Sequence, residues 1–545
     1  MASGKKTPID PASGPRMVLE GRVVAMTAPN RILDPGRLYI DQGAIVAVQP
    51  AAAPAPAGFD GVAVTATAGT IFPGLIELHN HLAYNVLRLW QVPKTYTNRD
   101  QWSGIPEYRR TVSGPMTILG ESPDLLPAVI RYVEAKCLVA GVTTSQGVAL
   151  FSNAGVRRYY RGIVRNVEQT DEAALPEAQT RIADVDAQSA AKFLERLKKE
   201  TCFLLHLAEG TDAVARQHFQ ALQISPSSWA ITPQLAGIHA AALRATDFAI
   251  YGRAGGAMIW SPMSNLLLYG GTADVAAAKS NGVRIGIGSD WAPSGSKNLL
   301  GELKVAKLYS DLHGGIFSSE EICAMATRTA AAILQWQAVL GTLEAGKRAD
   351  VLVVDGAAGD PFDHLIDAKE TDVVLVVING VPRYGTAALF SALGVTGAES
   401  VAVGSAARKF FLKQDTADPQ VGTISLADAT AALTDALGRL PQLAKALEKP
   451  KAVASLVRGA REPVWKLALD ELEDTGASVR ARLPLGHRHT GARALAGAGS
   501  QPLSSIVQPL TLDPLTVASD AKFLDTVAAE RNLPAGIGSG LAALY

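Results

Sequence analysis

The spacing of hydrophobic and polar positions changes three times along the chain. Residues 17–64 alternate short apolar runs with turn residues, as in MVLEGRVVAM and RLYIDQGAIVAV, and this pattern predicts strands and hairpins. From about residue 68, short apolar runs alternate with longer helical patterns such as DVDAQSAAKFLERLKKE. Residues 341–385 return to the strand pattern, and the rest is mostly helical in pattern before it becomes rich in Gly, Ala and Pro near Leu483.

The middle region contains the candidate strands IFPGLIELH, CLVAGVTT, GIVRNV, CFLLHLAE, LAGIHA, AMIWSP and VRIGIGSD, and an eighth fits weakly at RIADV, residues 181–185. Alternation of strands with helices implies parallel strands joined by crossover helices. Eight such units over about 270 residues match the size of a (β/α)8 TIM-type barrel. The alternative is an open doubly wound sheet, but no glycine-rich dinucleotide fingerprint follows any of these strands.

These patterns predict an α/β protein with three parts. Residues 17–67 and 341–385 are expected to form a small composite β-sandwich module. Residues 68–340 are expected to form the barrel. Residues 386–545 are predicted to be a mostly helical C-terminal extension, in which the sequence shows no chemistry.

Composition restricts the partners and the compartment. The 51 basic and 51 acidic side chains balance, so no long-range attraction to nucleic acid or to an anionic membrane is expected. Three scattered cysteines, Cys137, Cys202 and Cys323, argue against a disulfide framework and against a thiolate metal site. Neither a secretory signal nor a long apolar run is recognisable. We therefore expect a cytoplasmic homo-oligomer that acts on a small molecule, without nucleic-acid or membrane partners.

A pair of histidines marks the first candidate metal ligands. His79 and His81 lie two apart, and side chains at that spacing on a strand point to the same face. The apolar run IFPGLIEL precedes them, so the pair lies at the C-terminal end of a strand, where barrel active sites are found. Alone, this motif is weak. A second pair, His487 and His489, follows no strand pattern and is interpreted as a solvated loop.

Three further polar residues end apolar strands: His206 after CFLL, His239 after LAGI and Asp290 after VRIGIGS. Each could separately be a satisfied buried polar residue. Together with the histidine pair they favour one metal site, because unpaired polar groups gathered at strand ends are costly without a shared partner. Imidazole and carboxylate ligands suit zinc, iron or manganese. Glu209 follows His206 by three residues and is placed for proton transfer, although a solvated loop carboxylate is the alternative.

Five segments resemble motifs of the amidohydrolase superfamily, in its mononuclear deaminase and chlorohydrolase branch. They are PGLIELHNHL, HLAEG, SPMSNLLLYGG, IGSDWAP and LGTLEAGKRADVLVVD, and the resemblance spans residues 17–385. It implies metal ligation by four residues: His79, His81, His206 and Asp290. It also implies that Asp290 takes a proton from the attacking water, that His239 orients or polarises the attacked group, and that Glu209 protonates the leaving nitrogen.

The resemblance also bears on how many metal ions are bound. Binuclear members carry a carboxylated lysine on the fourth strand, and residues 181–185 contain no lysine. One divalent ion is therefore expected, with Zn²⁺ favoured over Fe²⁺ or Mn²⁺.

Candidate substrate contacts are mainly aromatic. Trp291 follows the expected metal ligand Asp290, and the loop 85–118 carries Tyr96 and Trp102 among its four aromatic residues at positions 90, 96, 102 and 108. Such rings could stack on a planar ligand, pack the loop on the barrel, or form a subunit contact. Asn265, within SPMSNLLLYGG, is a further candidate.

The sequence favours hydrolysis of a non-peptide carbon–nitrogen bond. Within that class we expect deamination of a cyclic amidine-like small molecule, because Glu209 and His239 together suit a leaving nitrogen. Hydrolysis of an amide, urea or carbamate by the same residues is one alternative. A metal-binding relative without catalytic activity is another.

Overall fold

The computed structural model describes residues 14–182, 185, 189–414, 418, 420–449, 463–470 and 501–545. The pair His487 and His489 lies outside the described residues. Among the described residues, no helix is long and apolar enough to cross a membrane.

Strands from both ends of the expected barrel region form one nine-stranded sheet. Its order is β20-β21-β19-β18-β17-β4-β1-β2-β3. The N-terminal strands are β1 (Met17–Val24), β2 (Ile32–Asp41), β3 (Ala44–Pro50) and β4 (Val64–Pro73). The others are β17 (Val351–Asp355), β18 (Val373–Ile378), β19 (Val381–Gly385), β20 (Glu399–Val403) and β21 (Ala406–Phe410). Antiparallel pairing of β4 with β17 joins the two segments, and apolar residues of both are buried together.

This sheet extends further than the sequence pattern indicated. The β pattern was expected to end at Gly385, but β21 pairs with β19 and β20 pairs with β21. In β20 exposed positions alternate with intermediate or buried ones, and in β21 Arg408 and Phe410 are the buried positions two apart, which is the spacing of a strand with one covered face. The segment after Gly385 is therefore not helical throughout.

Eight short parallel strands carry the candidate site. One sheet contains β5 (Leu75–Ile76), β6 (Val142–Ser145) and β9 (Arg165–Asn166). The other contains β10 (Ala178–Arg181), β11 (Cys202–Leu207), β14 (Leu235–His239), β15 (Ala257–Trp260) and β16 (Arg284–Ile287). Backbone hydrogen bonds connect the two sheets at both edges: Ala178 N–H donates to Val167 O at 2.8 Å, and Asp290 N–H donates to His79 O at 2.9 Å.

Three strand boundaries differ from the sequence expectation. The run IFPGLIELH divides at Gly74 between β4 and β5, where a β-carbon would lie 2.3 Å from the Thr143 side chain. The run CLVAGVTT begins in helix α3 (Leu126–Val139), and Gly141, at a φ of +75°, ends that helix before β6. The fourth strand, β10, begins at Ala178, ahead of the expected RIADV segment.

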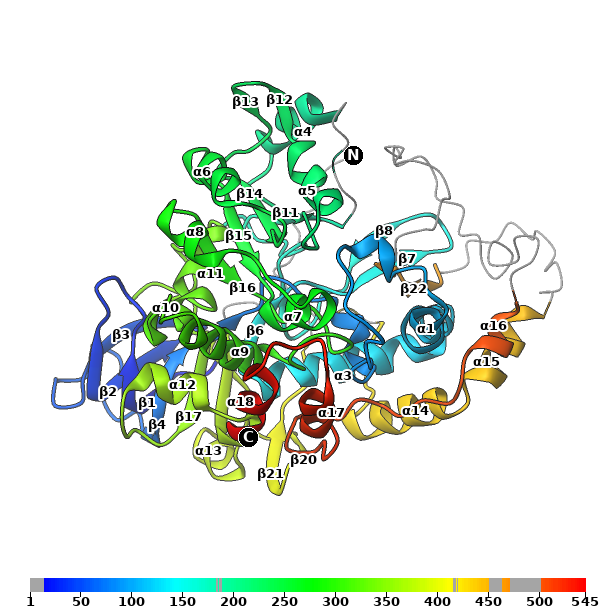
Figure 1. Cartoon of the computed structure of the whole chain (residues 1–545). Helices are drawn as coiled ribbons and strands as arrows, with labels where there is room; N and C mark the ends of the chain where they lie inside the picture. Colours follow the sequence, from blue (N-terminus) through cyan, green and yellow to red (C-terminus); the bar gives the residue numbers. More distant parts are fainter. Residues whose placement is uncertain are drawn as a thin grey trace, which may run out of the picture.

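Helices follow most of the parallel strands. They include α4 (Ala190–Leu197), α5 (Ala213–Gln220), α6 (Ala245–Arg253), α7 (Pro262–Tyr269), α8 (Val275–Ser280), α9 (Leu299–Leu312), α10 (Ser319–Met325) and α11 (Arg328–Ile333). Figure 1 shows them around the strands, with the nine-stranded sheet to one side. Between β5 and α3 the chain forms short helical turns: η1 (Leu82–Val86), η2 (Arg99–Gln101), α1 (Pro106–Tyr108), η3 (Arg109–Ser113), α2 (Gly114–Gly120) and η4 (Pro123–Leu125).

The remaining elements are short. After β6 come β7 (Ala149–Ser152) and β8 (Arg157–Tyr159), and a hairpin, β12 (Gln223–Ser225) with β13 (Ser228–Trp229), follows α5. Helices α12 (Pro361–Asp367), η6 (Glu370–Asp372) and α13 (Ala387–Ala392) lie among the strands of the large sheet in sequence.

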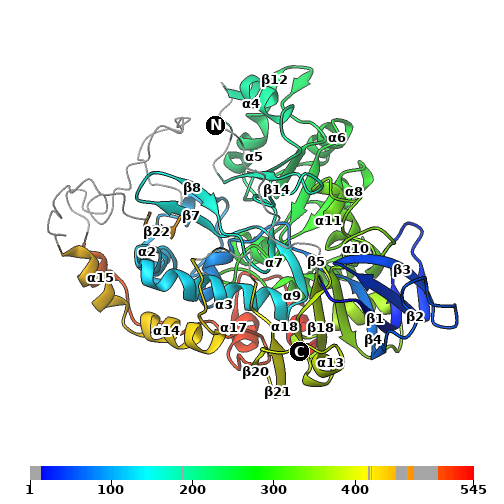
Figure 2. The ribbon, with the colours of Figure 1, turned by 180° about the vertical axis from the view of Figure 1, so that it is seen from behind.

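The C-terminal region packs against the rest of the molecule at several places. Helix α14 (Leu426–Gly438) contacts α3, as the view from behind shows (Figure 2). Helix α15 (Leu440–Glu448) contacts α16 (Leu503–Ile506). Helices α17 (Phe523–Ala529) and α18 (Ile537–Ala543) pack together, and α18 contacts α9. The strand β22 (Trp465–Leu467) pairs with β7.

A buried ion network also fixes this region. Lys297 Nζ lies 2.5 Å from Asp513 Oδ1 and 2.9 Å from Asp520 Oδ2, and Lys136 also pairs with Asp513. Charges buried in this way must be paired, so the network holds the C-terminal tail against the loop that follows β16.

Candidate metal centre and active site

The ends of the parallel strands bring the five predicted strand-end residues together. His79 Nε2 lies 3.1 Å from Asp290 Oδ1, and His81 Nε2 lies 3.4 Å from the same oxygen. The ring centres of His79 and His206 are 4.7 Å apart, and those of His206 and His239 are 5.3 Å apart. His79 and Asp290 are 211 positions apart in the sequence, so it is the pairing of the strands that brings their ends together.

An unusual backbone conformation orients the side chains of His239 and Asp290. His239 and Asp290 have φ values of +68° and +65°, in the left-handed region that residues other than glycine rarely adopt. Each such residue costs about 1–3 kcal/mol, and strained residues of this kind gather at functional sites. The strain turns each side chain at the point where its strand ends.

The donor set fits a divalent metal ion. Ligand atoms lie within 4.8 Å of one another in three overlapping groups: His79 with His81 and His206, His79 with His239 and Asp290, and His206 with Glu209 and His239. Within the described residues, His79 Nε2 and His206 Nδ1 are buried and have no hydrogen-bond partner, since the Asp290 oxygen near His79 is not aligned for one. Buried polar nitrogens without partners are costly, and an ion would satisfy them.

Electrostatics keep Asp290 and His206 in the protonation states that a metal requires. Burial alone would raise the pKa of Asp290, but His79, His239 and His81 outweigh it and hold that pKa well below its usual range. Burial lowers the pKa of His206 well below its usual value. These two candidate ligands are therefore a carboxylate and a neutral imidazole, the forms that bind metal.

Neighbouring side chains fix the orientation of the ligands. Gln146 Oε1, at the end of β6, lies 3.0 Å from His79 Nδ1 and accepts the Asn80 N–H at 2.9 Å. Because an amide oxygen only accepts, His79 carries its proton on Nδ1 and turns Nε2 toward Asp290. Glu77 accepts hydrogen bonds from the N–H and the hydroxyl of Ser289, directly before Asp290. Burial raises the pKa of Glu77 to about 8.

Glu209 lies beside the ligand cluster in a network of its own. The Tyr269 hydroxyl donates to Glu209 Oε1 at 2.7 Å, and the Trp102 indole N–H donates to the Tyr269 oxygen at 2.9 Å. Glu209 Oε2 lies 3.5 Å from Arg99 Nη1 and 3.7 Å from His239 Nε2. One carboxylate oxygen is thus anchored, and the other faces the cluster.

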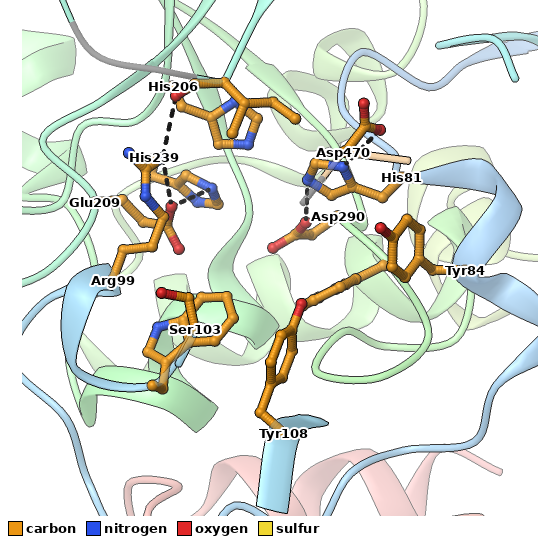
Figure 3. A pocket seen from close by; sticks show the side chains of 13 residues that line it. His81, Tyr84, Arg99, Ser103, Tyr108, His206, Glu209, His239, Asp290 and Asp470 are labelled. Carbon is orange, nitrogen blue, oxygen red and sulfur yellow. Dashed lines mark hydrogen bonds and ion pairs between the residues drawn. The ribbon is translucent and has the colours of Figure 1, made fainter. Parts of the chain in front are cut away.

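A pocket opens onto this cluster (Figure 3). It is lined by His81, Tyr84, Arg99, Trp102, Ser103, Tyr108, Ile182, His206, Glu209, His239, Asp290, Trp291 and Asp470. Figure 3 shows His81, Asp290 and Asp470 on one side and His239, Glu209 and Arg99 on the other. The rings of Trp102, Tyr108 and Trp291 lie within 6.2 Å of one another, centre to centre, and form an aromatic wall.

Two of the four predicted substrate contacts line the pocket, Trp102 and Trp291. The other two do not. Tyr96 is buried, and its N–H donates to Leu268 O, which packs the loop on α7. Asn265 contacts His239 Nδ1 at 3.0 Å from behind. Tyr96 and Asn265 therefore lie behind the residues that line the pocket and support them.

Sequence reasoning missed two charged pocket residues, Arg99 and Asp470. Arg99 lies three positions before Trp102 in the loop 85–118. Because that loop already supplied candidate substrate contacts, its charged side chains could also have been considered. Asp470 belongs to the segment after Gly385, in which no motif indicated chemistry. Only the folding of that segment onto β7 brings it to the site.

Comparison with known proteins finds several relatives named as deaminases. A 5-methylthioadenosine/S-adenosylhomocysteine deaminase of Symbiobacterium thermophilum is 24% identical over 420 residues, covering 67% of this chain and 92% of that protein. A protein of the same name from Teredinibacter turnerae is 29% identical over 186 residues. That match covers 33% of this chain and 42% of the relative.

A solved structure shares the fold of this chain, and a family model identifies its family. The triazine hydrolase of Arthrobacter aurescens has a TM-score of 0.51 at 21% identity, covering 67% of this chain and 94% of that one, so the two share a fold. The model of the amidohydrolase family matches residues 70–383, which is more than half of the chain and contains all of the strand-end cluster. The resemblance noted from the sequence motifs is confirmed, and the chain belongs to the amidohydrolase family.

Proposed function

We propose that this protein is a metal-dependent hydrolase that deaminates a planar, cyclic amidine-like small molecule. The observation that carries the proposal is the convergence of His79, His81, His206 and Asp290 at one point, with Glu209 and His239 beside it. These four ligands would hold a single divalent ion. Zn²⁺ is the ion we favour, because imidazole nitrogens with one carboxylate suit zinc.

The residues divide the reaction between them. When bound, a divalent ion supplies a water nucleophile at neutral pH by lowering the pKa of that water. Asp290, an ionised carboxylate at the cluster, accepts a proton from the attacking water. The water oxygen adds to the amidine carbon, the carbon–nitrogen bond breaks, and Glu209, which enters this step protonated, delivers the proton with which the nitrogen leaves as ammonia. Asp290 then releases the proton that it took from the water and Glu209 regains one, so that protons balance over the cycle. Tyr269 holds the Glu209 carboxylate in place for this transfer.

The neutral imidazole of His239 suits a polarising role. Burial lowers the pKa of His239 to about 4, so the ring is uncharged at neutral pH. Its Nε2 points toward Glu209 and the pocket, and an Nε2–H there donates a hydrogen bond to the ring nitrogen or oxygen that gains charge during attack.

The aromatic wall supports a flat substrate. Trp102, Tyr108 and Trp291 line the pocket together, and such rings stack favourably on planar heterocycles. The names of the relatives, deaminases of adenosine derivatives and a triazine hydrolase, refer to molecules with planar nitrogen rings. A flat amino-substituted heterocycle is therefore the class we infer for this chain.

We also propose the domain arrangement that the sequence predicted. Residues 68–340 would form one closed (β/α)8 barrel, supported by the parallel pairing of β5 to β16 and by the hydrogen bond from Asp290 N–H to His79 O. Residues 17–67 and 341–385 would form the β module, to which β20 and β21 add two strands.

The proposal is tested by metal content and by ammonia release. The purified protein should contain about one zinc per chain by elemental analysis, and His79→Ala should lose it. His313→Ala is the matched control, because His313 is exposed and stacks on Tyr309. At least some members of a panel of amino-substituted heterocycles should release ammonia. If only amides or ureas are turned over, the enzyme is an amide or urea hydrolase and the proposed deamination is wrong. Absence of metal even after reconstitution would overturn the proposal.

A further inference from the structure

The two histidines of the first motif have different partners behind them. His79 Nδ1 faces the neutral amide of Gln146, which lies within the matched amidohydrolase region. His81 Nδ1 faces a carboxylate, Asp470 Oδ2, at 3.2 Å. Asp470 is 389 positions away in the sequence and lies outside residues 70–383. One ligand is thus supported from the barrel region and the other from the C-terminal segment.

The geometry of the His81 ring makes this contact directional. Its Nε2 lies 3.4 Å from Asp290 Oδ1, on the side of the ring that faces the cluster. Asp470 approaches Nδ1, the other nitrogen, so the ring is held between two carboxylates (Figure 3). A carboxylate at Nδ1 keeps the proton on that nitrogen and leaves the Nε2 lone pair for an ion.

The segment that carries Asp470 is fixed by several independent contacts. β22 pairs antiparallel with β7, and Ala468 N–H donates to Ala149 O at 2.8 Å, two residues before Asp470. The Arg158 guanidinium lies 4.2 Å from the centre of the Trp465 ring. Lys466 pairs with Glu121 on the opposite side of the strand from the buried Leu467. The strand register therefore decides that Asp470, rather than a neighbour, reaches His81.

We propose that Asp470 is a positioning residue for the metal ligand His81, so that the C-terminal segment completes a metal centre otherwise built from the amidohydrolase region. This inference rests on the proposed metal-dependent function. Asp470 acts through its contact with the His81 ring: it fixes the tautomer and the rotation of the imidazole. The carboxylate also lines the pocket, so its charge faces the same cavity as the ligands.

Zinc affinity is the direct test, measured for the full-length protein by competition with a chromophoric chelator. Loss of such a supporting partner lowers metal affinity by about 10- to 100-fold, and this is the loss expected for Asp470→Ala. Asp470→Asn keeps an oxygen that can accept from Nδ1–H, so it should recover part of that loss. Thermal unfolding of the metal-free proteins would show whether each variant is folded, and if Asp470→Ala is not, Asp470→Asn carries the test.

Lys466→Ala is the matched control. It removes the ion pair with Glu121 on the same strand without touching His81, so it should keep zinc affinity within about threefold of the wild type. If it loses zinc as strongly as Asp470→Ala, docking of the strand explains the effect and the positioning role is overturned.

The remaining outcomes separate this inference from the proposed function. A wild-type protein that takes up no zinc would refute the metal-dependent function itself. A wild type that binds zinc, with Asp470→Ala binding it equally well, would refute only the role of Asp470. A raised KM with unchanged zinc affinity would assign Asp470 to substrate contact and would equally overturn the positioning role.

Discussion

Asn265 donates an amide hydrogen to His239 Nδ1 over 3.0 Å, and a relay of hydrogen bonds fixes this direction. The indole N–H of Trp260 can only donate, and it donates to Thr272 Oγ1. Thr272 donates its own hydrogen to Asn265 Oδ1, at 3.2 Å. The Asn265 amide nitrogen therefore faces His239, whose Nδ1 accepts, and the neutral ring carries its proton on Nε2, toward the pocket.

Asn265→Asp tests this relay. A carboxylate accepts from Nδ1–H, so the tautomer reverses and the Nε2 donor is lost; we expect kcat to fall by about 100-fold or more. The same carboxylate stabilises the imidazolium, so the pKa of His239 rises from about 4. The acidic limb of the pH–rate profile therefore shifts to higher pH. Thr272→Val only frees the amide to rotate and should have a smaller effect. An Asn265→Asp enzyme with the wild-type rate and profile would refute the assignment.

Glu209→Gln should separate chemistry from metal binding. The amide keeps the size of the side chain but cannot transfer a proton, so kcat should fall by about 10²- to 10⁴-fold. Zinc content should be unchanged, because Glu209 is not among the proposed ligands. Ammonia release and elemental analysis measure the two quantities. Full turnover in this variant would remove Glu209 from the mechanism, while loss of zinc would make it a ligand.

Trp291→Leu should weaken substrate binding at the aromatic wall. Stacking on a planar ring contributes about 0.5–1.5 kcal/mol beyond the buried area, so KM should rise by about tenfold, with zinc content retained. Trp229→Leu is the control, because Trp229 stacks on Phe219 and does not line the pocket. An unchanged KM would show that the substrate does not contact this wall.

Glu302 should make stability depend on pH. Burial raises its pKa to about 8 and outweighs the hydrogen bonds from Ser296 and the Met263 N–H, which by themselves lower that pKa. In the unfolded chain the carboxyl ionises near its usual pKa, so folding stability falls as pH rises from about 4.5 to about 8.

Glu302→Gln removes this titration while keeping groups that bond Ser296 and the Met263 N–H. The Tm of the variant relative to the wild type should therefore rise between pH 5 and pH 8. Glu195→Gln, at an exposed position, should leave the Tm difference flat. A Tm difference that does not change with pH would show that Glu302 is ionised in the folded protein.

Much of the site followed from local pattern. The strand-end positions of His206, His239 and Asp290 could be predicted because each ends a run of apolar residues, and parallel strands end at one face. Their convergence to distances near 3 Å could not, because it depends on strand stagger and on the left-handed backbone at His239 and Asp290. The weak β10 was misplaced by three residues because its residues, AQTR, carry little apolar signal.

The sequence by itself determined the strand–helix alternation, the candidate ligand residues and the amidohydrolase family, because these depend on residue type and spacing along the chain. Only the tertiary structure decided what surrounds them. It places Asn265 against Nδ1 of His239 and Arg99 beside Glu209. It also places Asp470 beside His81, which is 389 positions away in the sequence. Such contacts depend on the register of strands such as β22 with β7, which is set by packing between segments distant in sequence.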